Sequence, residues 1–315
     1  MKALVTGAAG FIGSHIAEAL CRRGAKVIAF DDLSAGCLQN LAWSREGHPE
    51  LEFVQRDVTD KLAIQDALRG CDWVFHEAAV ASVPFSVAHP RETNEANLTA
   101  ALQLLIAARE AGVKRFVFAS SSAIYGDSDA PIKHEAHAPD PLTPYALQKF
   151  AAERYARMFH HLYGLPTVSL RYFNVFGPRQ SFQSPYSGVI ARFCTAMLGG
   201  EPPTIFGDGL QSRDFVYIDN VVSANLLAVE EPVERVAGGV FNIGGGESIT
   251  LLDLVAVLNR LTGQQLKPRF ESARAGDVRH SRADISAARR ELRYEPSVTW
   301  QEGLGRTLNF YKGQA

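Results

Sequence analysis

Tyr145 and Lys149 have the residue types and the spacing of a proton-transfer pair. They are four positions apart, so on a helix the lysine ammonium lies one turn from the tyrosine phenol. A free phenol has a pKa near ~10, and holding half of it ionised at neutral pH needs a shift of roughly 3 units, or about 4 kcal/mol. A nearby positive charge supplies part of that shift, because it favours the phenolate. The pair therefore predicts a tyrosine that abstracts a proton, although this spacing alone is common on amphipathic helices.

The N-terminal residues predict a turn that binds phosphate. An apolar strand at 2–6 runs into glycines, and a helical pattern of apolar residues follows them. Without side chains, the backbone of such a turn approaches a pyrophosphate closely, and the N–H groups of the helix N-terminus face it. A tight turn with only a structural role is the alternative. The residues that we expect to hold the diphosphate of a dinucleotide are Gly7, Gly10, Phe11, Ile12 and Gly13.

The second expected strand, 26–30, ends at Asp31. A carboxylate at this position accepts hydrogen bonds from the adenosine ribose hydroxyls and repels a 2′-phosphate. The sequence therefore favours NAD over NADP as the cofactor. Asp32 is adjacent, and we choose Asp31 by its position in the motif.

The composition narrows the class of protein without identifying a reaction. The chain has 315 residues, a net charge of −2, nine histidines and four cysteines without C-x-x-C spacing. This charge gives no electrostatic case for binding to nucleic acid or a membrane surface. Neither the cysteines nor the histidines have the spacing of metal ligands. We expect a cytoplasmic protein with reduced cysteines, no metal, no signal peptide and no membrane span.

Strands and helices alternate along the first half of the chain at the spacing of βαβ units. We expect strands at 2–6, 26–30, 51–55, 72–76, 115–120 and 166–171, and helices near 11–23, 61–69, 94–112 and 145–163. This order predicts an α/β fold, a Rossmann-like, doubly wound parallel sheet that binds ligands at the carboxyl ends of its strands.

The second half is irregular and richer in loops, which we expect at 178–188, 199–214 and 271–282. This change predicts two domains. Residues 1–177 form an NAD-binding domain, and 215–243 return to it, with strands at 215–217 and 240–243 as candidates to rejoin the main sheet. Residues 178–214 and 244–315 form a smaller, loop-rich C-terminal domain for the substrate.

Several longer motifs accompany the glycine turn and the Tyr-x-x-x-Lys pair. They are Asp57-Val58, His76-Glu77-Ala78-Ala79, Asn97, the Ser120-Ser121-Ser122 to Tyr125-Gly126 run, the stretch from Arg171 to Pro178, Ser212-Arg213-Asp214-Phe215-Val216-Tyr217 and Arg274-Ala275-Gly276-Asp277-Val278. Together they resemble the extended short-chain dehydrogenases/reductases of the UDP-galactose 4-epimerase type, over essentially the whole chain. The stretches 76–86 and 274–284 look most similar to bacterial UDP-N-acetylglucosamine 4-epimerases.

The resemblance implies a role for each matching residue at the cofactor. Tyr145 is the base, Ser121 aligns or relays the proton, and Lys149 bridges the nicotinamide ribose hydroxyls while its charge lowers the pKa of Tyr145. Asp57 accepts from the adenine amino group, and Asn97 orients the nicotinamide region. The further implied contacts to a tightly bound, regenerated NAD are Val58, Ala78, Ala79, Tyr145 and Tyr172.

The resemblance also implies the substrate, a UDP-sugar. Arg213 and Arg274 are the candidate diphosphate clamps, because guanidinium pairs well with phosphate oxygens. Ser281 falls at the size gate for the sugar 2-position, where a small residue leaves space for an N-acetyl group. The remaining implied contacts are Ser82, Ser121, Ser122, Asn174, Val189 and Asp277. We predict interconversion of UDP-N-acetylglucosamine (UDP-GlcNAc) and UDP-N-acetylgalactosamine (UDP-GalNAc) through a transient 4-keto intermediate, and activity on UDP-glucose (UDP-Glc) and UDP-galactose stays open.

Three other functions compete with this prediction. A 4,6-dehydratase carries an Asp-Glu pair after its serine or threonine, where this chain has Ser122 and Ala123, which cannot drive elimination. A UDP-glucuronate 4-epimerase remains open. A non-catalytic nucleotide-sensing module, from a different class, usually lacks the tyrosine or the lysine.

Two further questions concern assembly and one loop. Surplus apolar residues on the helices near 94–112 and 145–163 predict a homodimer through a four-helix contact. The residues in question are Leu98, Leu102, Leu105 and Ile106 on the first helix and Phe150, Tyr155, Met158, Phe159 and Leu162 on the second. Whether Glu77, Ser82 and Ser86 touch the sugar or only shape the loop after the fourth strand stays open.

Overall fold

The computed structural model describes residues 1–48, 50–128, 130–181, 188–273 and 278–313. Its centre is a seven-stranded sheet with the strand order β12-β7-β5-β4-β1-β2-β3, and every neighbouring pair in it is parallel. The strands are β1 (Lys2–Thr6), β2 (Lys26–Asp31), β3 (Leu51–Gln55), β4 (Trp73–His76), β5 (Arg115–Ser121), β7 (Thr167–Tyr172) and β12 (Gly239–Ile243). The α/β, doubly wound prediction is confirmed.

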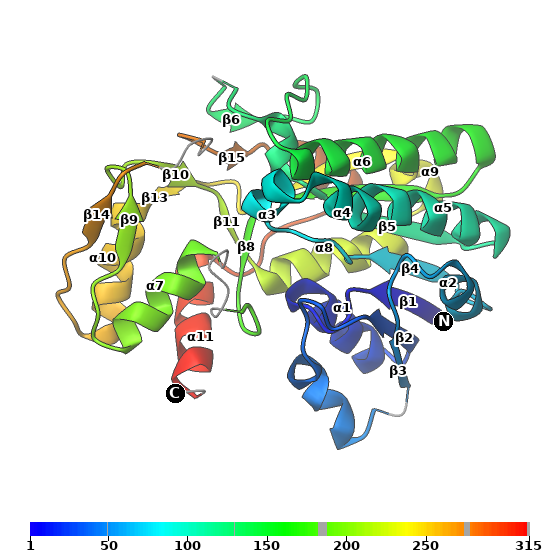
Figure 1. Cartoon of the computed structure of the whole chain (residues 1–315), viewed down its shortest axis with the longest axis horizontal. Helices are drawn as coiled ribbons and strands as arrows, with labels where there is room; N and C mark the ends of the chain where they lie inside the picture. The colour runs from blue at the N-terminus through cyan, green and yellow to red at the C-terminus, as the bar shows by residue number, and fades with distance from the viewer. Residues whose placement is uncertain (49, 129, 182–187, 274–277, 314–315) are drawn as a thin grey trace.

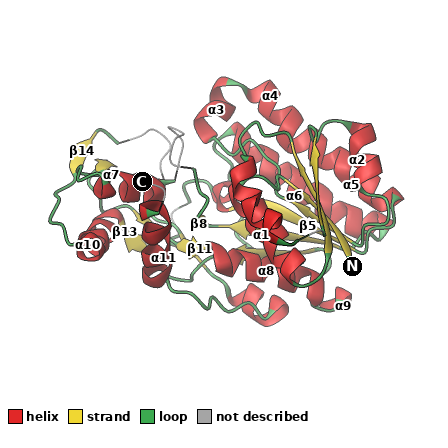
Figure 2. Cartoon of the chain, turned by 90° about the horizontal axis from the view of Figure 1, so that it is seen from below, coloured by secondary structure: helices red, strands yellow, loops and turns green. Residues whose placement is uncertain are grey.

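Helices cover both faces of the sheet, as a parallel sheet requires (Figures 1 and 2). One face carries α1 (Phe11–Arg22) and α8 (Ile218–Glu230), and the other carries α2 (Lys61–Ala67), α5 (Ala100–Glu110) and α6 (Pro144–Tyr163). Successive strand residues point to opposite faces. Val5 accordingly joins one buried hydrophobic cluster and Leu4 the other.

A second group of elements lies beyond the carboxyl ends of the strands, at the left in Figure 1. Its helices are α7 (Val189–Leu198), α10 (Leu251–Thr262) and α11 (Trp300–Lys312). Four two-stranded pairs accompany them: β8 (Asn174–Phe176) with β11 (Phe215–Tyr217), β9 (Thr204–Phe206) with β14 (Arg269–Glu271), β10 (Ser212–Arg213) with β13 (Ile249–Thr250), and β6 (Ile132–Lys133) with β15 (Arg282–Ala283).

Short helical elements complete the described chain. They are η1 (Leu38–Glu46), α3 (Val83–Ala88), α4 (Pro90–Asn94), η2 (Glu95–Thr99), η3 (Ser122–Tyr125), α9 (Val233–Val236) and η4 (Ala288–Leu292). Among the described residues, no helix is both long and apolar enough to cross a membrane.

Two sequence expectations need correction. The segment 240–243 joins the main sheet as β12, but 215–217 pairs as β11 with β8. The backbone leaves the main sheet at Phe173, so the Asn174 amide bonds to the Asp214 carbonyl, at 3.0 Å. The expected helix at 94–112 is interrupted by the π-helical turn η2.

The division into two domains stays a prediction, because one hydrophobic cluster joins the sheet to α7, α10 and α11.

Candidate active site

The glycine turn packs directly against the end of β4. Gly7 has φ +67°, and a Cβ atom there would lie 2.8 Å from the Ala78 nitrogen. A Cβ atom on Gly13 would lie 2.2 Å from the Gly7 carbonyl oxygen. Only glycine allows both approaches, since real Cβ atoms do not come so close to backbone atoms. The structure thus brings together Gly7, Gly13 and Ala78, three of the residues expected at the cofactor.

Helix α1 begins at this turn and presents its first amide groups to the same edge of the sheet. Within the described part of the chain, no side chain caps its N-terminus, and its first turn holds no acidic residue. The N–H groups of Phe11 and Ile12 therefore belong to a helix end without a side-chain acceptor, which favours an anion there.

Asp31 lies beside the glycine turn and is only 7% exposed. Its Oδ2 accepts a hydrogen bond from the Ala9 amide at 2.9 Å, and its Oδ1 accepts from the Leu33 amide at 2.8 Å. Desolvation raises the pKa of Asp31 above its ordinary value, against these hydrogen bonds. The carboxylate holds the turn in place, and its expected contact with the ribose stays a prediction.

The three expected catalytic residues converge at the ends of β5 and α6. Thr143 caps α6 by accepting from the Ala146 amide, and the Tyr145 side chain is hydrogen-bonded to Ser121, the last residue of β5. Lys149 is buried, its Nζ donates to the Ala119 carbonyl at 2.7 Å, and it lies 5.1 Å from the centre of the Phe118 ring.

Burial has the largest effect on the protonation of this group in the chain alone. Desolvation raises the pKa of Tyr145, although the hydrogen bond from Ser121 lowers it. Desolvation also lowers the pKa of Lys149, to about 8. That the charge of Lys149, together with the oxidised cofactor, lowers the pKa of Tyr145 stays a prediction; in the chain alone, the cost of burying a phenolate outweighs the favourable contacts.

Sequence reasoning left Glu77 undecided and missed Asn225. Glu77 follows β4, and its Oε1 accepts a hydrogen bond from the Tyr172 hydroxyl at 2.9 Å. That hydroxyl accepts in turn from Asn225 of α8 at 2.7 Å. Desolvation raises the pKa of Glu77 to about 7, while the Tyr172 hydrogen bond and the Lys149 charge lower it. The sequence pointed to Glu77 through its position in the His-Glu-Ala-Ala motif. No sequence pattern pointed to Asn225, because it is far in sequence from the residues that it contacts.

Asn97 and Asp57 have protein partners in the structure. The Asn97 side chain accepts from the Val80 amide at 2.8 Å and donates to the Val80 carbonyl at 3.1 Å and to Gln148 at 2.9 Å. It therefore fixes the loop after β4 against α6. Asp57 accepts from the Thr59 amide and hydroxyl. Neither arrangement tests the roles expected for these residues at the nicotinamide and adenine.

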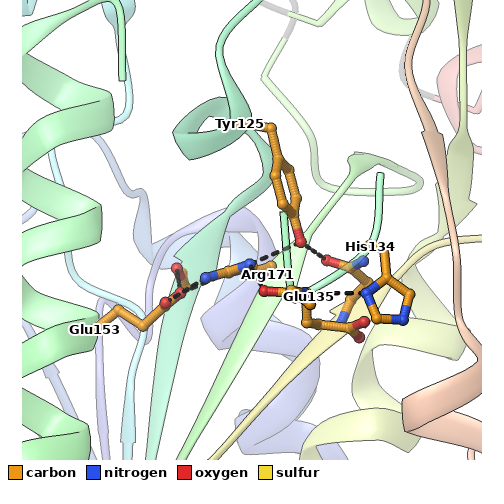
Figure 3. Close-up of polar contacts among 8 residues, drawn as sticks. Tyr125, His134, Glu135, Glu153 and Arg171 are labelled. Atoms are coloured by element: carbon orange, nitrogen blue, oxygen red, sulfur yellow. Dashed lines mark hydrogen bonds and ion pairs between the residues drawn. The ribbon is translucent and has the colours of Figure 1, made fainter. Parts of the chain in front are cut away.

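A buried ion pair joins the catalytic helix to the sheet. Arg171 of β7 donates from Nη2 and Nε to the carboxylate of Glu153 on α6, at 2.7 and 2.9 Å, as Figure 3 shows. Ser120 donates to the same carboxylate at 2.6 Å. On the other side, Arg171 donates to the Tyr125 hydroxyl, which donates to Asn242. Sequence reasoning noticed Tyr125 and Arg171 but neither the direct contact between them nor Glu153, which lies one helical turn after Lys149 on α6.

The residues expected at the sugar nucleotide are spread over several elements. Ser82 caps α3, Ser122 begins η3, Asn174 begins β8 and Val189 begins α7. Arg213 and Ser281 lie close together, because both donate to the Ser212 carbonyl. Nη1 of Arg213 lies 2.9 Å from this oxygen, and the Ser281 amide nitrogen lies 3.1 Å from it. Arg274 and Asp277 lie outside the described residues.

These features fit a dinucleotide. The helix end without a cap, the turn that excludes side chains and the buried carboxylate at the end of β2 all lie at the carboxyl edge of the sheet, where doubly wound proteins bind nucleotides. Tyr145 and Lys149 end at the same edge, next to β5. The described part of the chain shows no group of three or more His, Cys, Asp or Glu residues that could hold a metal ion.

Residues 3–244 match the NAD dependent epimerase/dehydratase family. The chain belongs to this family. The chain is 38% identical, over the full length of both chains, to a UDP-glucose 4-epimerase of Mycolicibacterium smegmatis.

Solved structures agree with this assignment. The chain is similar to UDP-N-acetylglucosamine 4-epimerase from Methanobrevibacter ruminantium in complex with UDP-N-acetylmuramic acid, with a TM-score of 0.94, 40% identity and coverage of 100% of this chain and 99% of that one. It is also similar to UDP-glucuronic acid 4-epimerase from Bacillus cereus in complex with UDP-glucuronic acid and NAD, with a TM-score of 0.92, 33% identity and full coverage of both chains.

Proposed function

We propose that this chain is an NAD-dependent UDP-sugar 4-epimerase. The observation that carries the proposal is the convergence of Tyr145, Ser121 and Lys149 at the same edge of the sheet as the glycine turn, because a proton acceptor next to a nicotinamide is what oxidation of a sugar hydroxyl requires. The relatives act on three kinds of UDP-sugar, which supports the reaction class without deciding between the sugars.

Each residue of the group has a separate task in this reaction. Tyr145 removes the proton of the sugar 4-hydroxyl, and Ser121, hydrogen-bonded to Tyr145, aligns that hydroxyl. Lys149, whose Nζ donates to the Ala119 carbonyl, would hold the nicotinamide ribose and supply a positive charge near the phenol. The chemistry that NAD supplies when bound is reversible hydride transfer at C4. A turn of the 4-keto sugar about its diphosphate link would present its other face to the cofactor and so allow C4 to be inverted.

The preferred sugar is proposed to be the UDP-GlcNAc/UDP-GalNAc pair. Ser281 is small and lies beside Arg213, since both bond to the Ser212 carbonyl. A diphosphate clamp and a sugar gate are expected to be neighbours, and a serine there leaves volume for an acetamido group. UDP-Glc and UDP-glucuronate are the competing substrates, because relatives of similar identity carry those names.

The test is to incubate the purified protein, without added NAD, with UDP-GlcNAc, UDP-Glc and UDP-glucuronate separately, and to follow the anomeric signals by NMR. We expect UDP-GalNAc to form from UDP-GlcNAc. Turnover of UDP-Glc or UDP-glucuronate alone would keep the epimerase and refute the sugar assignment. No turnover of any of the three, with NAD supplied, would refute the function. Tyr145→Phe is the control, and we expect its rate to fall at least ~100-fold while its NAD content is retained.

We also propose that the protein is a homodimer through α5 and α6, which lie side by side (Figure 1). Leu105 and Phe159, counted in the sequence among the surplus apolar residues, are buried within the subunit. Ile106, Met158 and Leu162 remain 39%, 45% and 64% exposed, and exposed apolar residues on neighbouring helices favour a partner. Light scattering at micromolar concentration tests this, and a monomer mass would contradict it.

A further inference from the structure

Glu77 is a half-buried carboxylate at the carboxyl edge of the sheet. Two consecutive hydrogen bonds, from Asn225 to Tyr172 and from Tyr172 to Glu77, set its orientation. Asn225 Nδ2 donates to the Val221 carbonyl at 2.9 Å as well as to the Tyr172 hydroxyl at 2.7 Å. A carbonyl can only accept, so the amide nitrogen of Asn225 is correctly placed as the donor. The Tyr172 hydroxyl therefore uses a lone pair toward Asn225 and directs its proton at Glu77.

The strand register places this carboxylate at the level of the catalytic residues. His76, the last residue of β4, pairs with Phe118 of β5, and Tyr172 of β7 pairs with Ser121 of the same strand. Glu77 and Tyr172 thus come from the strands on either side of β5 and meet at its carboxyl end. Lys149 reaches the same end of β5, where it bonds to the Ala119 carbonyl.

The charges around Glu77 come from a small set of groups. From α6, Lys149 and Tyr145 both interact electrostatically with Glu77. From β7, Tyr172 donates its hydrogen bond, and from α8, Asn225 is neutral. From β4, His76 is buried and bonded to the Thr6 hydroxyl at 2.8 Å. Burial and the Lys149 charge lower its pKa to about 3, so it adds no charge near neutral pH.

We propose that Glu77 is the counter-charge of Lys149 and a positioning residue of the reaction, so that the catalytic centre is a Tyr145–Lys149–Glu77 group and not a tyrosine–lysine pair. The carboxylate stabilises the ammonium of Lys149 and opposes the phenolate of Tyr145, and by both effects it sets the pH range of proton transfer. The hydrogen bonds from Asn225 to Tyr172 and from Tyr172 to Glu77 hold the carboxylate in its orientation. The inference rests on the proposed function only in assigning Tyr145 as the base.

The sign of each effect follows from the charges. An anion disfavours a second anion, so Glu77 raises the pKa of Tyr145. It favours a neighbouring cation, so it also raises the pKa of Lys149, against desolvation. Removing the charge in Glu77→Gln is expected to move the titrations of Tyr145 and Lys149 to lower pH, by about one pH unit. Glutamine keeps the size of the side chain and an oxygen that accepts from Tyr172.

The direct test is a spectrophotometric titration of the purified holoenzyme near 295 nm, where phenolate absorbs. The absorbance change missing in Tyr145→Phe belongs to Tyr145. We expect its midpoint to fall by about one pH unit in Glu77→Gln and to stay near that of the wild type in Glu77→Asp, which keeps the charge. A midpoint in Glu77→Gln within 0.2 unit of the wild type, roughly the reproducibility of such titrations, would overturn the proposal.

Two further measurements separate this role from simple structural support. Both limbs of the pH profile of kcat/KM should move to lower pH in Glu77→Gln, whereas a structural role would lower the profile without moving it. If Glu77→Gln does not fold, Glu77→Ser removes the same charge with a smaller side chain and must lower the Tyr145 midpoint relative to the wild type and Glu77→Asp; an unchanged midpoint would overturn the proposal. A shifted midpoint in a protein that turns over no UDP-sugar would refute the proposed function and leave this inference standing.

Discussion

The Glu153→Gln substitution tests how strongly the ion pair behind the catalytic helix stabilises the protein. The Arg171 and Glu153 side chains are 4% and 2% exposed, and two hydrogen bonds of 2.7 and 2.9 Å join them. Glutamine keeps one accepting oxygen but removes the negative charge. The guanidinium of Arg171 then stays buried without a counter-ion, and among the described residues the other side chain that it bonds to is the neutral Tyr125 hydroxyl.

Breaking a buried ion pair by removing one partner costs about 3–5 kcal/mol, and we expect the lower end because glutamine still accepts a hydrogen bond. For a chain of 315 residues, a loss of about 3 kcal/mol lowers the melting temperature by roughly 4–5 °C. Thermal unfolding of the holoenzyme, followed by circular dichroism, measures this change.

Glu302→Gln is the matched control. Glu302 pairs with Arg306 at 2.7 Å, the same distance as the buried pair, but the two side chains are 51% and 47% exposed. Solvent screens such a pair, so the melting temperature should stay within the reproducibility of the measurement. Equal melting temperatures for the two variants would refute the reasoning, because burial is the difference that separates them.

Two further substitutions test the site itself. Gly13→Ala places a Cβ atom 2.2 Å from the Gly7 carbonyl oxygen, whereas Gly305→Ala enters open space. We expect the first to weaken NAD binding at least ~10-fold, or about 1.4 kcal/mol, and the second to leave it unchanged in a fluorescence titration; similar affinities would contradict the close packing of the turn. Ser281→Tyr fills the proposed acetamido space, so conversion of UDP-GlcNAc should be lost while conversion of any accepted UDP-Glc is spared. Equal loss of both in an NMR assay would refute the gate.

The sequence determined those parts of the protein that depend on short-range spacing. The glycine turn, the strand before it and the helix after it follow from residues within a few positions of one another, and so does the Tyr-x-x-x-Lys pair on α6. The alternation of strands and helices was enough to predict the doubly wound sheet, because parallel strands need crossover helices.

Only the tertiary structure decided which distant side chains meet and what charge they carry. Glu77 and Tyr172 are 95 positions apart, and Arg171 and Glu153 come from different elements. No local pattern encodes these pairs, since they arise where neighbouring strands end at one edge of the sheet. The same holds for the raised pKa of Tyr145, which depends on how much protein surrounds the phenol, and for β11, whose strand pattern could not say which neighbour it pairs with.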